Sequence, residues 1–233
     1  RFFTEYLATN NIKIDDEKFL PGDNLEKIEV DKISGMLPVK GFDTRQEWFV
    51  KGTKPTAQST WYKNLVVCKA DGNLTNDSCS ENGNTDTKLF VKVEAERPEW
   101  QTGVDSWIKE HYNNDDRYFP PTINTILEFD SEGKVTNKDA VKAQIVGVKS
   151  GDKVPLLFRL NVEVSAYDDV DKVTIYMDGN KVTEDTSKPF GYNFELNSGD
   201  IGKHKFKATA KTEKGNKDET EVELEVTGYS LYE

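Results

Sequence analysis

The chain has 233 residues, and its 42 Asp and Glu residues outnumber its 31 Lys and Arg residues, giving a formal net charge of −11. This acidic balance, without any basic patch, excludes a nucleic-acid-binding surface. With 35% hydrophobic and 31% charged residues, the composition predicts folded modules with polar loops, in a chain long enough for one large or two ordinary domains. No apolar run approaches the roughly 18 residues of a membrane span, so we expect membrane contact only through an anchor upstream of Arg1.

The first 56 residues are predicted to combine a short helix with turn-rich extended segments. Aromatic and aliphatic side chains recur at helical spacing within residues 1–11. The pattern V-D-x-x-S-G-x-L-P over residues 30–38 predicts a strand that turns at Gly35 into a second extended piece, because glycine adopts positive φ readily. The pattern E-x-F-x-x-G-T-x-P over residues 47–55 predicts a short apolar strand that ends in a turn.

Residues 57–133 are predicted to be rich in β-structure. Residues 61–68 and 88–95 have the composition of strands and would form a hairpin with a long tip. Cys68 and Cys79 lie at this tip among turn-forming residues. They are either two free thiols or one disulfide, and the disulfide is favoured because exposed thiols on a polar loop are unusual. A disulfide would place the chain outside the cytoplasm.

Oxygen-bearing side chains alternate along this loop, which leaves two interpretations open. An EF-hand would need glycine where Asn76 stands and a bidentate glutamate where Asn82 stands. A polar loop held by the disulfide is therefore favoured over a calcium site, and no other cofactor is predicted. The weak calcium candidates are Asp71, Asn73, Thr75 and Asp77.

Tryptophans are the other candidate binding residues in this half of the chain. Trp107 falls on the apolar face of a helix predicted over residues 103–112, and we expect Trp107 and Trp48 to pack in a core. Trp61 and Trp100 flank the predicted hairpin. These two rings could either pack inward or stack against a glycan.

The last hundred residues, 134–233, predict an all-β sandwich. Alternating apolar and polar residues form regularly spaced segments with turn signals between them. Asp178-Gly179 in particular indicates a tight hairpin. The predicted strands are Val141–Val148, Pro155–Ala166, Lys172–Met177, Asn180–Glu184, Phe190–Leu196, His204–Thr212 and Glu219–Thr227.

Three motifs in this region resemble bacterial immunoglobulin-like domains. They are V-T-I-Y-M-D-G-N-K-V, P-F-x-Y-N-F-E-L and G-x-H-x-F-K-A-T-A-x-T-x-x-G-N, within residues 142–228. The resemblance implies the fold and is silent about a ligand, because such domains serve as spacers as well as binders.

The two motifs at residues 30–38 and 47–55 resemble, in order and spacing, the segment that leaves the transpeptidase domain of class A penicillin-binding proteins. These proteins are bifunctional peptidoglycan glycosyltransferases and transpeptidases. The resemblance implies that residues 1–56 complete or follow such a domain, as its end and exit segment. Residues 57–133 would then form an insert, and residues 134–233 the immunoglobulin-like sandwich. It also implies an extracytoplasmic location in the cell envelope.

We therefore expect a mainly β, non-catalytic accessory region that positions a synthase on peptidoglycan or on other cell-envelope proteins. The alternative is a secreted adhesin or carbohydrate-binding module, whose binding could depend on calcium.

Catalysis by this chain itself is not expected. A transpeptidase needs Ser-x-x-Lys, Ser-x-Asn and Lys-Thr-Gly or Lys-Ser-Gly in that order, since the lysine deprotonates the nucleophilic serine and the later motifs close the pocket. Ser106 and Lys109 match the first motif, but the match to the second, at residues 80–82, precedes them. A Ser–His–Asp triad would need His111 or His204, which are predicted to serve packing or a turn hydrogen bond.

Overall fold

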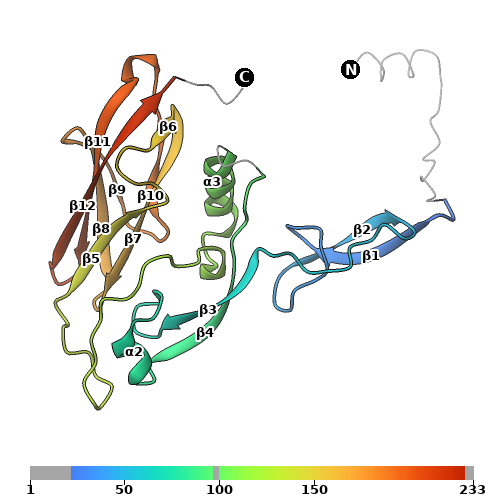
Figure 1. Ribbon diagram of the computed structural model, residues 1–233, viewed down its shortest axis with the longest axis horizontal. Helices are drawn as coiled ribbons and strands as arrows, with labels where there is room; N and C mark the ends of the chain where they lie inside the picture. The colour runs from blue at the N-terminus through green and yellow to red at the C-terminus, as the bar shows by residue number, and fades with distance from the viewer. Residues whose placement is uncertain (1–21, 97–99, 229–233) are drawn as a thin grey trace, which may run out of the picture. The chain divides into compact units, whose positions relative to one another are not determined.

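The computed structural model describes residues 22–96 and 100–228, and the described chain is mainly β (Figure 1). It divides into two compact units, residues 1–60 and residues 61–233. The helix predicted over residues 1–11 lies outside the described residues. The three-part division of the sequence into domains stays a prediction.

The first unit contains an antiparallel pair of strands, β1 (Leu25–Asp31) and β2 (Thr44–Val50). Leu25 lies opposite Val50 and Asp31 opposite Thr44. A small core of Val30, Val39 and Phe42 is buried beside the pair. The second extended piece predicted directly after Gly35 is not a strand, because the chain forms turns from Lys32 until β2 begins.

The two sequence motifs of this unit, at residues 30–38 and 47–55, each form a turn. The carboxylate of the buried residue Asp31 accepts hydrogen bonds from the amides of Ile33 and Ser34, and from the Ser34 hydroxyl at 2.7 Å. Gly35 follows with φ of +68°. In the second motif, the amide and hydroxyl of Thr53 both donate to the Val50 carbonyl, at 2.9 and 2.8 Å. The Asp, Ser and Gly of the first motif and the Thr of the second are thus explained by turn geometry.

The second unit begins with the predicted hairpin, formed by β3 (Tyr62–Cys68) and β4 (Thr85–Val91). The second strand starts and ends earlier than predicted, because the polar run Thr85–Lys88 pairs with β3 although it lacks an apolar pattern. The Cys68–Cys79 disulfide is present, with both cysteines fully buried. It joins the end of β3 to α2 (Asp77–Glu81), a one-turn helix within the segment predicted to be a loop.

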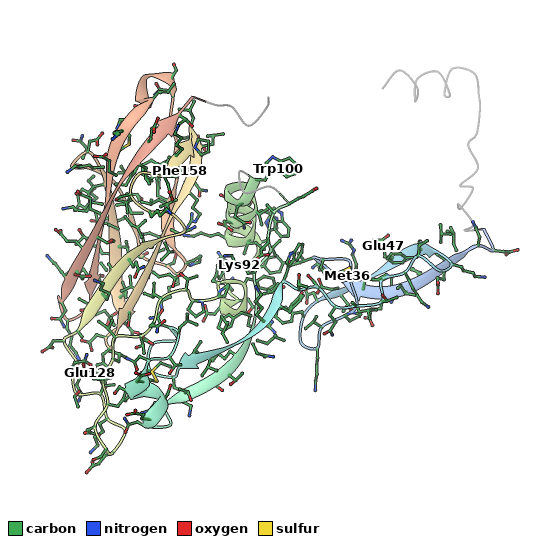
Figure 2. The ribbon with its side chains drawn as sticks, in the orientation of Figure 1. Met36, Glu47, Lys92, Trp100, Glu128 and Phe158 are labelled. Atoms are coloured by element: carbon green, nitrogen blue, oxygen red, sulfur yellow. A yellow bond between two sulfur atoms is a disulfide. The ribbon has the colours of Figure 1, made fainter. Side chains whose placement is uncertain are left out.

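The immunoglobulin-like sandwich consists of a five-stranded sheet in the order β6-β12-β11-β8-β9 and a three-stranded sheet in the order β10-β7-β5. Phe158, Phe194 and Phe206 pack against one another inside it, with ring centroids 5.0 to 5.5 Å apart (Phe158 is labelled in Figure 2). The strands are β5 (Val141–Val146), β6 (Lys153–Pro155), β7 (Leu157–Ala166), β8 (Val170–Met177), β9 (Asn180–Asp185), β10 (Phe190–Glu195), β11 (Gly202–Thr212) and β12 (Lys217–Thr227).

The predicted sandwich strands are therefore confirmed, and one further strand, β6, is added. With three residues, β6 is too short to show an alternating pattern, and it pairs in parallel with β12. The predicted Asp178-Gly179 hairpin is also confirmed, with φ of +50° and +80° at its two central residues.

The outer face of the five-stranded sheet is covered by charged pairs. Lys203, Lys205 and Lys207 on β11 each approach a glutamate on β12 at 3.4 Å. These alternating residues point away from the core, where cross-strand pairs of opposite charge are favourable. The charges on this face are therefore locally neutralised, and Lys207 Nζ also lies over the Tyr176 ring of β8.

The three-stranded sheet is instead covered by a helix and a strap. The helix α3 (Gln101–Tyr112) contacts β7. The strap, residues 122–137, buries Ile123, Leu127 and Val135. The apolar segment 125–129 is not a strand, and within it only Phe129 forms an isolated bridge, with Val135. A short 3-10 turn, η2 (Asp116–Tyr118), connects the helix to the strap.

Candidate binding surface

The helix α3 is fastened to the sandwich by polar side chains on one of its faces. Lys109 Nζ donates to Asp185 Oδ2 at 3.0 Å and to the Pro189 carbonyl at 2.8 Å. Ser106 Oγ donates to Asn193 Oδ1 at 3.2 Å. The two residues that match Ser-x-x-Lys are therefore part of the helix attachment, which accounts for them structurally.

Arg159 on β7 lies below this attachment and is buried. Its guanidinium donates to Asn161, to Asn193 and to the Pro189 carbonyl, at 2.8 to 3.2 Å. Burial lowers the pKa of Arg159, while the carboxylates of Asp185 and Asp105 raise it. The pKa of Asp105 on α3 is itself raised, chiefly by burial. Opposite charges therefore meet where the helix contacts the sheet, so α3 has a defined orientation.

Besides this attachment, α3 carries three aromatic rings, which together with Tyr118 from η2 form a cluster that we call the ring stack: Trp107, His111, Tyr112 and Tyr118. The Trp107 and His111 rings stack at 4.6 Å between centroids, and the Tyr112 and Tyr118 rings stack at 4.0 Å. Trp107 and Tyr112 meet at 5.6 Å in a tilted arrangement. His111 Nδ1 also lies 2.9 Å from the Trp107 carbonyl, so its ring is held in place.

The ring stack runs from a buried end to an exposed end. Tyr118 is buried, whereas Trp107 keeps 43% of its surface exposed and His111 is exposed. The predictions that Trp107 and Trp48 pack in a core are therefore wrong. His111 has a packing role, as predicted, but it packs against the Trp107 ring at the surface. Only Ile108 among the apolar residues of α3 is buried, because the face toward the sheet is taken up by Ser106 and Lys109.

The two tryptophans named as possible glycan-stacking residues differ in exposure. Trp100, at the start of α3, keeps 46% of its surface exposed (Figure 2), whereas Trp61, just before β3, is half-buried. The glycan-stacking role of either residue stays a prediction.

The residues named as calcium candidates contact different protein groups. Asp71 Oδ2 accepts hydrogen bonds from Asn73 Nδ2 at 2.8 Å, from Thr125 Oγ1 at 2.9 Å and from Ser165 Oγ at 2.6 Å. Thr75 Oγ1 lies 2.8 Å from the Ser80 hydroxyl, and Asp77 is exposed in the first turn of α2. Within residues 22–96 and 100–228, no group of three or more His, Cys, Asp or Glu residues could hold a metal ion. The Asp71 carboxylate instead connects the disulfide loop, the strap and β7.

His204 has the structural role that the sequence predicted. Its Nδ1 lies 2.6 Å from Asp178 Oδ2 and its Nε2 lies 2.9 Å from the Asp200 carbonyl. Hydrogen bonding to Asp178 raises the pKa of His204, and the same bond lowers the pKa of Asp178. The pair stabilises the β8–β9 turn against the start of β11.

Two segments of the chain match known family models. Residues 144–208 match the family model of a bacterial Ig domain, which is the class of the sandwich. Residues 21–64 match the family model described as penicillin-binding protein 1A, C-terminal domain. Each match covers less than half of the chain. Together they support the two resemblances drawn from the motifs, and they correspond to non-catalytic regions.

Solved structures with a similar fold include a fibronectin(III)-like module of Clostridium thermocellum CbhA, with 19% identity over 39% of this chain and all of that chain, at a TM-score of 0.35. Another is Bacteroides ovatus SGBP-B in complex with a mixed-linkage heptasaccharide, with 19% identity over 38% of this chain and 25% of that chain, at a TM-score of 0.31. Likeness at this level carries no information about function. No curated protein matches the chain.

Among the residues that the structure describes, no helix is long and apolar enough to cross a membrane. The disulfide and the match to a penicillin-binding protein both suggest an extracellular location.

Proposed function

We propose that this chain is the non-catalytic C-terminal accessory region of a class A penicillin-binding protein and that it holds the synthase against peptidoglycan. The match at residues 21–64 supports the parent class. The parent would polymerise and cross-link peptidoglycan outside the cytoplasmic membrane, while this region would contribute contact with the wall.

The observation that carries the wall-binding role is the exposed end of the ring stack. A large aromatic ring that is exposed yet held by neighbouring rings loses little conformational entropy when a flat partner stacks on it. The pyranose rings of a glycan strand are such partners, and they leave the polar rim of the helix free for hydrogen bonds. The charged outer face of the five-stranded sheet offers no comparable surface.

The test is sedimentation of the full 233-residue chain with insoluble peptidoglycan. Trp107→Ala removes the tryptophan of the stack and leaves Ser106, Ile108 and Lys109 to hold the helix. It should therefore weaken binding by a few-fold to about tenfold, the range expected for an aromatic contact of about 0.5–1.5 kcal/mol. Trp48→Ala removes an equally exposed tryptophan from the first unit and is the matched control.

Wall binding that is unchanged by Trp107→Ala, or absent in the wild type, would contradict the proposal. Repeating the measurement with EDTA separates it from the alternative of a calcium-dependent adhesin. The proposal predicts no effect of EDTA on binding, whereas the adhesin alternative predicts loss of binding.

A further inference from the structure

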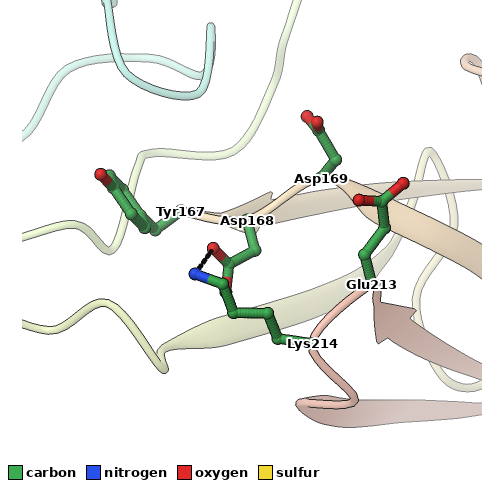
Figure 3. Close-up of a pocket in the computed structure, with 5 residues that line it drawn as sticks. All are labelled: Tyr167, Asp168, Asp169, Glu213 and Lys214. Carbon is green, nitrogen blue, oxygen red and sulfur yellow. Dashed lines mark hydrogen bonds and ion pairs between the residues drawn. The ribbon is translucent and has the colours of Figure 1, made fainter.

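A shallow recess of about 420 Å³ lies at one end of the sandwich, between the β7–β8 turn and the β11–β12 turn (Figure 3). It is lined by Tyr167, Asp168, Asp169, Glu213 and Lys214. The Glu213 amide donates to the Asp169 carbonyl at 2.9 Å, so the two turns are connected through their backbones. The recess therefore has walls that are held in place by the sheet ends.

Asp168 contributes a buried carboxylate to this recess. Its side chain is only 9% exposed, and Oδ1 lies 2.6 Å from Lys214 Nζ (Figure 3). Its other oxygen, Oδ2, is buried and has no hydrogen-bond partner among the residues that the structure describes. A buried charged oxygen without a donor is unfavourable. Asp168 therefore has an acceptor oxygen that its described neighbours leave unsatisfied.

The recess already shows which kind of donor fits it. Lys214 Nζ, besides contacting Asp168, lies 5.9 Å from the centroid of the Tyr167 ring, and Lys138 Nζ lies 5.7 Å from the same centroid. Tyr167 is 40% exposed. A carboxylate and an aromatic face together form a recognition element for a primary ammonium group, and in this chain the Lys214 side chain occupies it.

The surrounding charge favours an additional cation. Asp169 and Glu213 are exposed, and neither carboxylate forms an ion pair with a described residue. Three carboxylates thus line the recess, against two ammonium groups, that of Lys214 in its lining and that of Lys138 over the Tyr167 ring. The Lys214 side chain is 64% exposed, so solvent surrounds most of it and it has room to move away when a ligand competes for the same position.

We propose that this recess binds the primary ammonium group of a lysine-type side chain on a peptide. The ligand's ammonium group replaces Lys214 beside Asp168 and lies over the Tyr167 ring, while Asp169 and Glu213 attract it electrostatically. This site is separate from the ring stack of α3. That the peptide belongs to the cell wall rests on the function proposed above, whereas the ammonium chemistry follows from the recess itself.

The test is an NMR titration of the full chain with the peptide acetyl-Gly-Lys-Gly-amide, with the same peptide acetylated on Nε as the control ligand. We expect saturable shifts of the amide signals of residues 167–169 and 213–214, with a dissociation constant in the millimolar range, and no saturable shifts with the acetylated peptide. Shifts of equal size with both peptides, or none with either, would overturn the proposal.

Variants test the assigned roles. Tyr167→Ala and the double change Asp169→Asn with Glu213→Gln should each weaken binding at least threefold. Lys214→Met should strengthen binding several-fold, because it removes the internal competitor, and weaker binding by this variant would overturn the displacement. Two control variants should leave peptide binding unchanged: Glu223→Gln, on the outer face of the five-stranded sheet, and Trp107→Ala, in the ring stack. The peptide-binding test can therefore fail without the wall-binding test failing.

Discussion

Asp31 belongs to the first sequence motif, and its role there is structural. The buried carboxylate accepts three hydrogen bonds from the turn that follows it. Asp31→Ala would leave these donors without their acceptor, so we expect a loss of about 1–3 kcal/mol in the free energy of unfolding of the first unit. Urea denaturation followed by tryptophan fluorescence measures this loss, since Trp48 lies on β2.

The matched control is Asp43→Ala, which removes an exposed carboxylate paired with Lys32. Its effect should stay within about 0.5 kcal/mol, as is usual for surface pairs. Equal effects of the two substitutions would show that the Asp31 hydrogen bonds do not stabilise the turn.

The His204–Asp178 pair predicts a pH dependence. Because the pKa of His204 is raised above its ordinary 6.5, the pair contributes fully below pH 6.5, and its contribution is lost as the pH rises through the raised folded-state value. Because the pKa of Asp178 is lowered below 3.8, its contribution is present above pH 3.8 and is lost as the pH falls further. The pair should therefore stabilise the fold most between pH 3.8 and 6.5.

The measurement is the melting temperature of the wild type and of His204→Gln from pH 4 to pH 9. We expect the difference between the two proteins to be largest in the acidic part of this range and to shrink toward pH 9. In an Asp178→Asn background, where asparagine tolerates the positive φ, His204→Gln should lose most of this pH dependence. A difference that grows with rising pH would contradict the assignment.

At the scale of elements, Asp71 connects three segments that are distant in the sequence. Its carboxylate accepts from Thr125 in the strap and from Ser165 on β7, and both of these residues are buried. Asp71→Ala should cost about 2 kcal/mol or more, because it leaves buried hydroxyl groups without an acceptor. Asp77→Ala, in the exposed first turn of α2, is the control and should have a small effect in the same thermal or urea unfolding experiment. Equal stability of the two variants would contradict this role.

The elements that could be predicted from the sequence are those with a strong local pattern. The strands of the sandwich alternate clearly, and Asp178-Gly179 indicates its turn directly, because both depend on neighbouring residues. The helix α3 was also predicted, but the exposure of Trp107 was not. That exposure depends on Asp185, Pro189 and Asn193, which hold the helix from distant parts of the chain, and no local pattern reports such contacts.

Short elements and shared contacts were missed for the same reason. The strand β6 has three residues, and α2 depends on Asn76 as its N-cap and on the disulfide. The recess beside Tyr167 combines two turns separated by more than forty residues of sequence. The alternation of oxygen side chains from Asp71 onward is visible in the sequence, but the direction of each side chain is set by its tertiary partner.

At the scale of the whole molecule, two matched segments and one exposed ring stack support a common account. The first unit carries the match to a penicillin-binding protein C-terminal domain, and the second carries the immunoglobulin-like sandwich. Ser106 and Lys109, which match the Ser-x-x-Lys motif, attach α3 to the sandwich. Catalysis in the proposed parent would therefore depend on residues outside this chain.

The most direct test of this account is to read the gene upstream of the codon for Arg1. The account predicts that the same reading frame encodes Ser-x-x-Lys, Ser-x-Asn and Lys-Thr-Gly, in that order, before this segment. A signal peptide immediately upstream, without these motifs, would contradict the account and would favour a secreted adhesin or carbohydrate-binding module instead.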